Sequence, residues 1–486
     1  MTEVSCFPNM KRLPQVFLLA VGLLLAGLTV LRITQSWPND SHLDHVSGAW
    51  VALASDVRAG VFYRAPFGPE GYGGTRFFPL FFCLHALGIV LGGSWRLSGY
   101  VLSAASMLAL LAGVYCLLRR LGVERWLSVA GLITVLAGSS VQDAFLTIRE
   151  DGLAAGLNLW GVVLCSGEVS RRRIYFAALL FALAFATKET SVFGAGAVIL
   201  SWLLSTKIKD ALHLLAATAI GYVAVVLAIY AASAGRAFEV LRLTLATGSG
   251  LMPLLNSPVT MVEAMNGYRA EMILLALGLT ALLLGRRLFP GLLFLCTLAV
   301  TLVIFSSEGT AGNHLIDLLV ASVVIFIVWI SQFRDVGLCL LASASLVAGL
   351  GIVVQHRYDD KVAVHTQLQE IARAVGTSDK PILSDNPLVP LSAGQRPYVL
   401  DAFMFRVLEE RLPNFGDPMW QMLKQRRFSA VVLVDNPDSD EGKDTYDNYH
   451  FGNDFMEVMR QNYEAAGSAG TEYIFLPKKS PQATPP

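Results

Sequence analysis

The chain has 486 residues, of which 54% are hydrophobic and only 15% are charged. A soluble domain carries about 25% charged residues, so this composition excludes an ordinary soluble enzyme and predicts a polytopic α-helical membrane protein. Lysine plus arginine and aspartate plus glutamate number 37 each, so the basic excess of a nucleic-acid-binding protein is missing. The six cysteines lack the spacing of a metal site, and neither a zinc site nor a disulfide framework is expected.

The first apolar run, 16–30, follows Lys11 and Arg12, and no small-x-small cleavage site comes after it. It is therefore expected to be an uncleaved anchor with its N-terminus in the cytoplasm. Later apolar runs bring the expected number of transmembrane helices to about eleven, each near the ~20 residues that cross the hydrocarbon core. These runs lie near 98–117, 127–141, 152–167, 174–187, 190–205, 211–232, 272–285, 289–305, 315–332 and 337–354.

The basic residues between these runs test the predicted topology. If the chain alternates from a cytoplasmic N-terminus, the connections that face the cytoplasm are short and basic, as the positive-inside rule requires. They contain Arg119-Arg120 with Arg125, Arg171–Arg173, Lys207 with Lys209, Arg286-Arg287, and Arg334. The apolar run at 77–92 would reverse this pattern if it crossed, so Phe77–Leu91 is predicted to lie along the membrane interface.

Outside the membrane, the sequence predicts loops and one small domain. The predicted outer segments are the first loop (34–96), the second loop (142–151), 235–270, 306–314 and the polar C-terminal part. Residues 1–354 would form the transmembrane catalytic domain, 355–477 a small extracytoplasmic α/β domain, and 478–486 a disordered tail. The α/β domain is expected to contain helices at 362–375, 418–427 and 454–466, and strands at 382–383, 430–434 and 473–476.

Acidic residues gather in the first two loops. Asp40 and Asp44 lie in the first loop, and Glu150 and Asp151 directly precede an apolar helix. Helix capping is one explanation for the aspartates, because a carboxylate at a helix N-terminus accepts unpaired N–H groups and suits the helix dipole. The convergence of acids from two loops on one face of the membrane favours a functional site as the other explanation.

Basic residues are expected beside these acids. Arg76 follows a glycine-rich segment at 71–74, Arg149 precedes Glu150, and Lys188 lies where a predicted span turns back. The glycines would let backbone N–H groups approach a phosphate, or simply form a mobile loop. Snorkelling to the interface is the alternative interpretation of Lys188. Carboxylates with several cations suit a base that activates an acceptor and cations that hold a phosphate leaving group.

Several short motifs occur in the order and topology of a known family. They are Leu43-Asp-His-Val46, Arg76-Phe-Phe-Pro-Leu80, Arg149-Glu-Asp151, Leu183-Ala-Phe-Ala-Thr-Lys188 and Gly309-Thr-Ala-Gly-Asn-His314. Together they resemble the GT-C membrane glycosyltransferases, among them the protein O-mannosyltransferases and the aminoarabinose transferases of lipid A, in a family 39-like pattern. That family often has two adjacent acids in the first loop, whereas Asp44 is followed here by His45, so either Asp40 or Asp44 is the expected base.

The resemblance implies a GT-C fold and a polyprenyl-phosphate sugar donor. Transfer would go to a hydroxyl of a protein, lipid or glycan at the outer face of a bacterial plasma membrane. Asp44 would be the general base of an inverting displacement, and Asp151 would position the acceptor or help bind a divalent cation if one is used. The resemblance assigns no resident metal ion and implies that substrate is bound by Arg76, Arg149, Glu150, Lys188, His314 and Asp40.

Other interpretations stay open at this point. His314 at the mouth of a span is also explained as an ordinary polar contact. In the C-terminal part, Leu383–Pro387 and Pro397–Asp401 resemble segments of related proteins and fit either acceptor recognition or a structural cap. A transporter or lipid flippase is the main alternative to an enzyme, although it would place ionisable residues at mid-membrane, where only Asp317 comes near. A catalytically degenerate scaffold and an oligosaccharide ligase or phosphoglycan transferase are the further alternatives.

Overall fold

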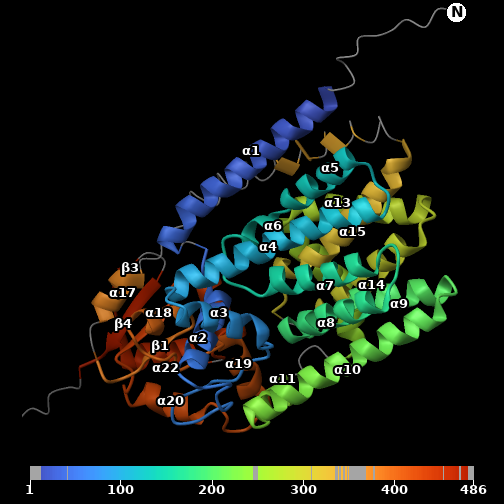
Figure 1. The fold of residues 1–486 in the computed structure, drawn as a ribbon. Coiled ribbons are helices and arrows are strands. Elements are labelled where there is room, and N and C mark those ends of the chain that lie inside the picture. Colours follow the sequence, from blue (N-terminus) through green and yellow to red (C-terminus); the bar gives the residue numbers. More distant parts are fainter. Residues whose placement is uncertain are drawn as a thin grey trace, which may run out of the picture.

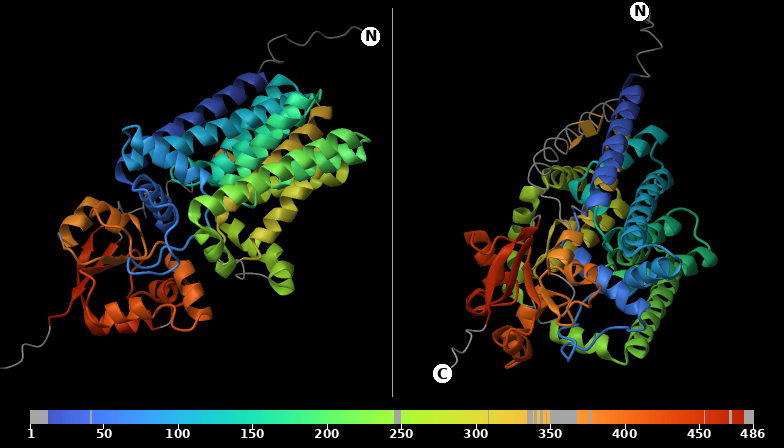
Figure 2. Two further views of the ribbon diagram at one scale, coloured as in Figure 1. Left: turned by 60° about the horizontal axis from the view of Figure 1, so that its bottom comes forward. Right: turned by 90° about the vertical axis from the view of Figure 1, so that its left-hand side faces the viewer.

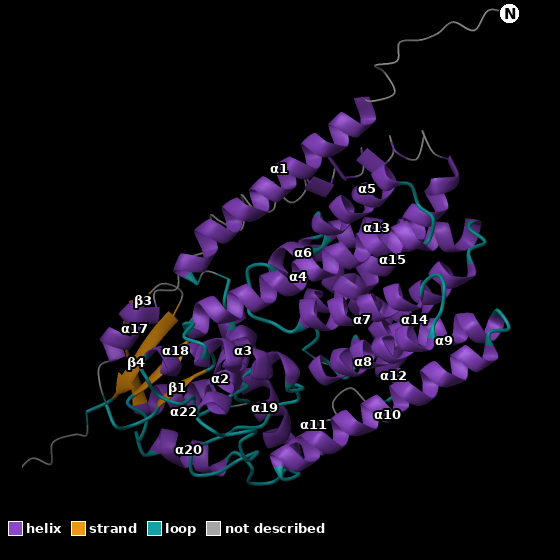
Figure 3. Ribbon diagram, viewed as in Figure 1, coloured by secondary structure: helices purple, strands orange, loops and turns teal. Residues whose placement is uncertain are grey.

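The computed structural model describes residues 13–479, except 41, 245–249, 308, 334–337, 339–340, 343–344, 347, 350–367, 376–377, 453 and 470–471. Most of the described chain is helical, and its strands gather at one end of a helical bundle (Figure 1, Figure 3). In the described part, four segments are long and apolar enough to cross a membrane, namely 14–39, 95–120, 208–233 and 312–333. This agrees with the prediction of a helical membrane protein.

The helices of the bundle follow the predicted apolar runs. Each run from 16–30 to 315–332 lies on one helix, except that 127–141 is divided between two, 125–136 and 139–144. The run 337–354 and the predicted domain boundary near 355 lie largely outside the described residues. The helices are α1 (Leu13–Ser36), α4 (Trp95–Arg120), α5 (Arg125–Leu136), α6 (Ser139–Ala144), α7 (Asp151–Cys165), α8 (Arg171–Thr187), α9 (Phe193–Leu204), α10 (Ile208–Ser233), α11 (Arg236–Thr244), α12 (Leu251–Ala264), α13 (Arg269–Leu284), α14 (Leu288–Ile304) and α15 (Ile316–Ile330).

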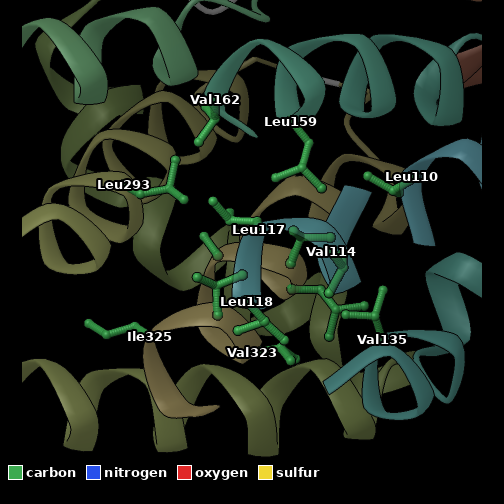
Figure 4. Close-up of a cluster of buried hydrophobic side chains, with 14 of the residues drawn as sticks. Leu110, Val114, Leu117, Leu118, Val135, Leu159, Val162, Leu293, Val323 and Ile325 are labelled. Atoms are coloured by element: carbon green, nitrogen blue, oxygen red, sulfur yellow. The ribbon is translucent and has the colours of Figure 1, made fainter. Parts of the chain in front are cut away.

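The core of the bundle forms around α15. Val323 of α15 and Leu117 and Leu118 of α4 are all fully buried and belong to one apolar cluster (Figure 4). By contrast, α10 leaves Ile220 and Leu227 exposed by 70% and 61% along the edge of the bundle. An apolar helix with such an exposed face is what a membrane protein presents to lipid.

Two short helices in the first loop lie at the end of the bundle that carries the strands. They are α2 (His45–Arg58) and α3 (Leu80–Val90). With 11 residues, α3 is about 16 Å long. That the run at 77–92 does not cross, and that it lies along the membrane interface, stay predictions.

The C-terminal part contains a mixed four-stranded sheet with the strand order β1-β2-β4-β3. Strands β1 and β2 are parallel, and β4 is antiparallel to both of its neighbours. The elements are α17 (Leu368–Val375), β1 (Ile382–Ser384), α18 (Leu388–Ser392), α19 (Ala402–Arg411), α20 (Asp417–Lys424), β2 (Ala430–Leu433), α21 (Asp440–Asp444), η6 (Thr445–Tyr449), α22 (Phe455–Asn462), β3 (Tyr463–Ala469) and β4 (Glu472–Pro477).

One predicted helix in this part was wrong over its last four residues. The expected helix at 454–466 ends at Asn462, and the chain continues as β3 in antiparallel pairing with β4. Tyr463 is buried there, and its hydroxyl accepts a hydrogen bond from the Phe428 N–H at 3.2 Å. Pairing with β4 and burial of Tyr463 thus override the helix preference of the alanines that follow.

The first loop is joined to the C-terminal part through the backbone. The N–H of Tyr72 donates to the Tyr398 carbonyl at 2.8 Å, and the N–H of Leu400 donates to the Tyr72 carbonyl at 3.0 Å. Gly71 has φ +91°, and a Cβ there would lie 2.0 Å from the Tyr398 oxygen, so this approach requires glycine. Figure 2 shows the first loop packed beside the C-terminal part, and the two therefore form one surface above the bundle.

Candidate active site

A cavity of about 620 Å³ lies where the bundle, the first loop and the C-terminal part meet. Its volume is in the range of small-molecule sites. The cavity is lined from the first loop by residues near 44–49 and 76–78, from the bundle by residues near 149–150, 187–190 and 303–314, and from the C-terminal part by residues near 385, 400–403 and 449–450.

Asp44 faces this cavity from the start of α2. Its Oδ1 accepts a hydrogen bond from the Ser47 N–H at 2.9 Å, so the capping expected from sequence is present. Its Oδ2 forms an ion pair with the Arg149 guanidinium, and its side chain is 40% exposed. Burial alone would raise the pKa of Asp44, but the guanidinium of Arg149 outweighs it and holds the pKa below the ordinary value. Asp44 is therefore ionised at neutral pH.

Lys188 reaches the cavity as the centre of a buried polar network. Its Nζ lies 2.5 Å from Oδ1 of Asp151 and 3.0 Å from Nδ1 of His314. Asn313 donates from Nδ2 to the other Asp151 oxygen at 3.0 Å. Lys188 is only 8% exposed, so it does not snorkel to solvent. The network fixes the ammonium group beside the cavity.

Asp151 lies behind this network and not on the cavity surface. It is the first residue of α7, is 5% exposed and is absent from the cavity lining. Since its two oxygens bind Lys188 and Asn313, its part in the site is to hold their side chains. Glu150, which does line the cavity, has a pKa raised to about 8 by burial and by the charge of Asp151. It is therefore mainly protonated at neutral pH and can donate a hydrogen bond.

Three cations face the cavity and are called here the cationic wall: Arg76, Arg149 and Lys188. The Arg76 guanidinium carbon lies 5.9 Å from the ring centroid of Phe403, a residue of α19 in the C-terminal part. Arginine favours such stacking on an aromatic face. The wall thus combines residues from the first loop, the second loop and the end of α8.

Asp40 lies apart from the cavity. It pairs with Arg96 Nε at 2.8 Å and accepts a hydrogen bond from the Tyr100 hydroxyl at 3.3 Å. Asp40 is 4% exposed and is absent from the cavity lining. Burial raises its pKa to about 6, although the nearby Arg96 acts in the opposite direction. Of the two acids that the first loop offers as a base, only Asp44 lies at the cavity.

The glycine-rich segment has a packing role. The Gly71 N–H donates to the Gly68 carbonyl, and the Gly73 N–H donates to the Pro66 carbonyl. Neither glycine lines the cavity. A Cβ at Gly73 would lie 2.2 Å from the Arg64 Cβ, so close packing explains this residue.

The two aspartates predicted as catalytic residues are both paired with cations. In the described part of the chain, no group of three or more His, Cys, Asp or Glu side chains could hold a metal ion. Asp44 is paired with Arg149, and Asp151 is paired with Lys188. Each carboxylate is thus already engaged by a cationic side chain.

Comparison with known proteins bears on the family. Residues 77–265 match the family model of glycosyltransferase family 87, which covers less than half of the chain. No curated protein matches the sequence significantly. ArnT from Cupriavidus metallidurans bound to undecaprenyl phosphate is 12% identical, with a TM-score of 0.57 over 93% of this chain and 97% of ArnT. The chain has the GT-C fold.

A second solved structure shares the fold of this chain. The oligosaccharyltransferase AglB from Archaeoglobus fulgidus, in complex with an inhibitory peptide and a dolichol-phosphate, is 12% identical. Its TM-score is 0.54 over 99% of this chain and 75% of AglB. The expected resemblance to the GT-C fold is confirmed, although the matching family model is that of family 87 and the motifs had indicated a family 39-like pattern.

The sequence motifs of the GT-C resemblance did not reveal all residues of the cavity. Asp385, Asp401, Tyr449 and His450 also line it, and all four come from the C-terminal part. The runs Leu383–Pro387 and Pro397–Asp401 contained a signal, because each was a candidate for acceptor recognition. His450 carried no such signal, since it belongs to none of the motifs and reaches His45 of the first loop only through the fold.

Proposed function

We propose that this GT-C chain is a glycosyltransferase that moves a sugar from a polyprenyl-phosphate donor to an acceptor hydroxyl, with inversion. The observation that carries the proposal is the cavity itself, in which the ionised carboxylate of Asp44 lies among the three cations of the cationic wall. The match of residues 77–265 to glycosyltransferase family 87 supports a sugar transfer. ArnT and AglB, which share the fold, were solved with polyprenyl phosphates, and this supports a donor of that class.

The proposed reaction is a single displacement. Asp44 takes the proton of the acceptor hydroxyl, whose oxygen attacks the anomeric carbon of the donor sugar. The bond between that carbon and the phosphate oxygen breaks, and the electron pair leaves with the polyprenyl phosphate. One displacement inverts the configuration. General-base assistance of this kind contributes about 10²–10⁴-fold in rate.

The cationic wall has the second task in this proposal. Charge develops on the departing phosphate, and fixed cations in a partly buried site stabilise it without reorganising. Arg76 and Arg149 present guanidinium groups suited to a phosphate, and Lys188 adds a compact charge. Asp151 is assigned a positioning role, because it holds Lys188 and Asn313.

His314 and Glu150 complete the proposed donor site. Since Lys188 donates to Nδ1 of His314, the Nε2 of that ring carries the proton and can donate to an oxygen of the donor. Protonated Glu150, which also lines the cavity, can do the same. Asp40 is left out of this assignment, because Arg96 and Tyr100 engage it away from the cavity.

We propose that the cavity opens on the outer face of a bacterial plasma membrane, in a chain with about eleven transmembrane helices and an extracytoplasmic C-terminal domain. The support comes from α8, which begins at the basic cluster Arg171–Arg173 and ends at Lys188 beside the cavity. Its 17 residues separate these two ends by about 26 Å. The basic cluster and the cavity would therefore face opposite sides of the membrane.

The test is donor turnover by the full chain in lipid nanodiscs. A panel of radiolabelled polyprenyl-phosphate sugars is supplied, and release of the free polyprenyl phosphate is followed with and without candidate acceptors. The proposal expects turnover of at least one donor and its loss in Lys188→Met. Asp210→Asn, in a residue of α10 that does not line the cavity, serves as control. No turnover of any donor in the panel would favour the transporter or scaffold interpretation.

A further inference from the structure

The C-terminal part supplies one whole side of the cavity. This side is called here the C-terminal wall, and its residues are Asp385, Leu400, Asp401, Phe403, Tyr449 and His450. It meets the donor-binding cations of the proposed mechanism at Phe403, whose ring centroid lies 5.9 Å from the Arg76 guanidinium carbon. The other five residues have no assigned part in the chemistry at Asp44 or in holding the phosphate.

His450 is fixed in this wall by a buried carboxylate. Its Nδ1 lies 3.3 Å from Oδ2 of Asp385, an oxygen that also accepts the Tyr446 hydroxyl at 3.3 Å. The backbone N–H of Val434 donates to the other Asp385 oxygen at 3.3 Å. Asp385 is 2% exposed and His450 is 8% exposed. Because Nδ1 is engaged with the carboxylate, Nε2 is the ring nitrogen that is left for a molecule in the cavity.

The His450 ring also lies beside the residue next to the proposed base. The centroids of the His45 and His450 rings are 5.1 Å apart and the rings are edge to face. His45 directly follows Asp44 at the start of α2. His450 and Asp44 thus line the same cavity, with His45 packed against the His450 ring.

The two walls differ in charge. The described lining residues of the C-terminal wall include the carboxylates of Asp385 and Asp401 and no lysine or arginine, whereas the cationic wall carries three cations. Of these three, Arg76 borders the C-terminal wall at Phe403. Arg406, whose guanidinium lies over Phe403, is not a lining residue and pairs with Glu410 at 2.7 Å. Burial and the nearby His450 lower the pKa of His45, so this ring adds no positive charge at neutral pH.

We propose that the C-terminal wall is the acceptor subsite, that His450 and Asp401 bind hydroxyls of the acceptor, and that the wall selects neutral polyol or sugar groups against anionic ones. The proposal rests on the glycosyltransferase function proposed above. Neutral hydroxyls can donate to Nε2 of His450 and to the carboxylate of Asp401. The Oδ1 of Asp401 also accepts the Met404 N–H at 3.0 Å and so caps α19. A phosphate or carboxylate on the acceptor would meet two negative charges instead. Tyr449, 53% exposed at the rim, offers an aromatic face to a sugar ring.

The test measures acceptor binding by ligand-observed NMR on the full chain in nanodiscs. The probes are butyl glycosides of glucose, mannose, galactose and arabinose, together with the 6-phosphate of butyl glucoside. At least one neutral glycoside is expected to bind, and His450→Phe is expected to weaken it about tenfold, as loss of one net hydrogen bond implies. His213→Phe, in an exposed residue of α10, is the matched control and should leave the dissociation constant unchanged.

A second variant tests the charge selectivity. Asparagine caps a helix as well as aspartate does, so Asp401→Asn keeps α19 capped while one negative charge leaves the wall. The preference for butyl glucoside over its 6-phosphate should shrink about threefold. An apparent melting temperature close to wild type confirms that each variant is folded.

Several outcomes would overturn the proposal. These are no binding of any neutral glycoside, equal affinity for butyl glucoside and its phosphate, or an unchanged dissociation constant in folded His450→Phe. Donor turnover, measured in the same preparations, decides the proposed transferase function separately. Turnover by wild type together with any of these results would retain the enzyme and reject the acceptor subsite.

Discussion

The ion pair between Asp151 and Lys188 gives the sharpest prediction on stability. Both residues are buried, at 5% and 8% exposure, and their charged atoms are 2.5 Å apart. In Asp151→Leu the ammonium of Lys188 loses its ionic partner and Asn313 loses an acceptor. Breaking a buried pair in this way costs about 3–5 kcal/mol, because a charge is left uncompensated in a site of low polarity. Lys188→Met alone strands the carboxylate and should cost a similar amount.

The double variant separates the pair from the rest of the site. In Asp151→Leu/Lys188→Met no charge is stranded, so most of the loss should be recovered and the coupling energy should exceed about 2 kcal/mol. The assay is unfolding in mixed micelles with increasing SDS, followed by circular dichroism, for wild type and the three variants. Additive effects, with a coupling below about 0.5 kcal/mol, would refute the claim that the two residues form one buried unit.

Three further predictions concern the first loop. Arg149→Gln removes the guanidinium that lowers the pKa of Asp44, so the acid limb of the pH–rate profile should move to higher pH. An unmoved limb would show that Asp44 is not the titrating base. Burial raises the pKa of Asp40 to about 6 in the folded state, above its unfolded value, so the folded state binds this proton more tightly. The contribution of Asp40 to stability should therefore fall as pH rises from about 4 to 6, and melting curves of Asp40→Asn should lack this pH dependence. Gly71→Ala should lower stability by more than about 1 kcal/mol, because φ is +91° and the new Cβ would strike the Tyr398 carbonyl; a melting temperature equal to that of wild type would contradict the packing described here.

The helices of the bundle could be predicted from the sequence because long apolar runs have few alternatives. The charges between those runs also predict that 77–92, which contains the 11-residue helix α3, does not cross. The prediction was wrong at 463–466, where the chain is part of β3. Alanines there favour a helix locally, but the strand is held by pairing with β4, which local sequence does not reveal.

The residues of the candidate site could be predicted only in part from the sequence. Asp44, Arg149 and Lys188 were recognised as charged residues in outer loops or at the ends of apolar runs, within motifs of the GT-C resemblance, and the structure brings them to one cavity. The choice between Asp40 and Asp44 required Arg96, a residue of α4 whose position beside Asp40 depends on packing.

The same limit applies to the C-terminal wall. His450 reaches the site only through the fold of residues 382–477 and their backbone pairing with the first loop at Tyr72. Contacts of such long sequence separation leave no periodic signal. The wall could therefore be described only once the structure was known.

The most direct test of the central claim is single-turnover sugar transfer by wild type and Asp44→Asn with donor bound at saturation. Asparagine nearly matches aspartate in size and keeps the cap of α2, but it cannot accept the hydroxyl proton. If Asp44 is the general base, the transfer rate falls by about 10²–10⁴-fold while donor binding persists. A rate within about threefold of wild type, at a step shown to be chemistry, would contradict the assignment of Asp44 and the mechanism built on it.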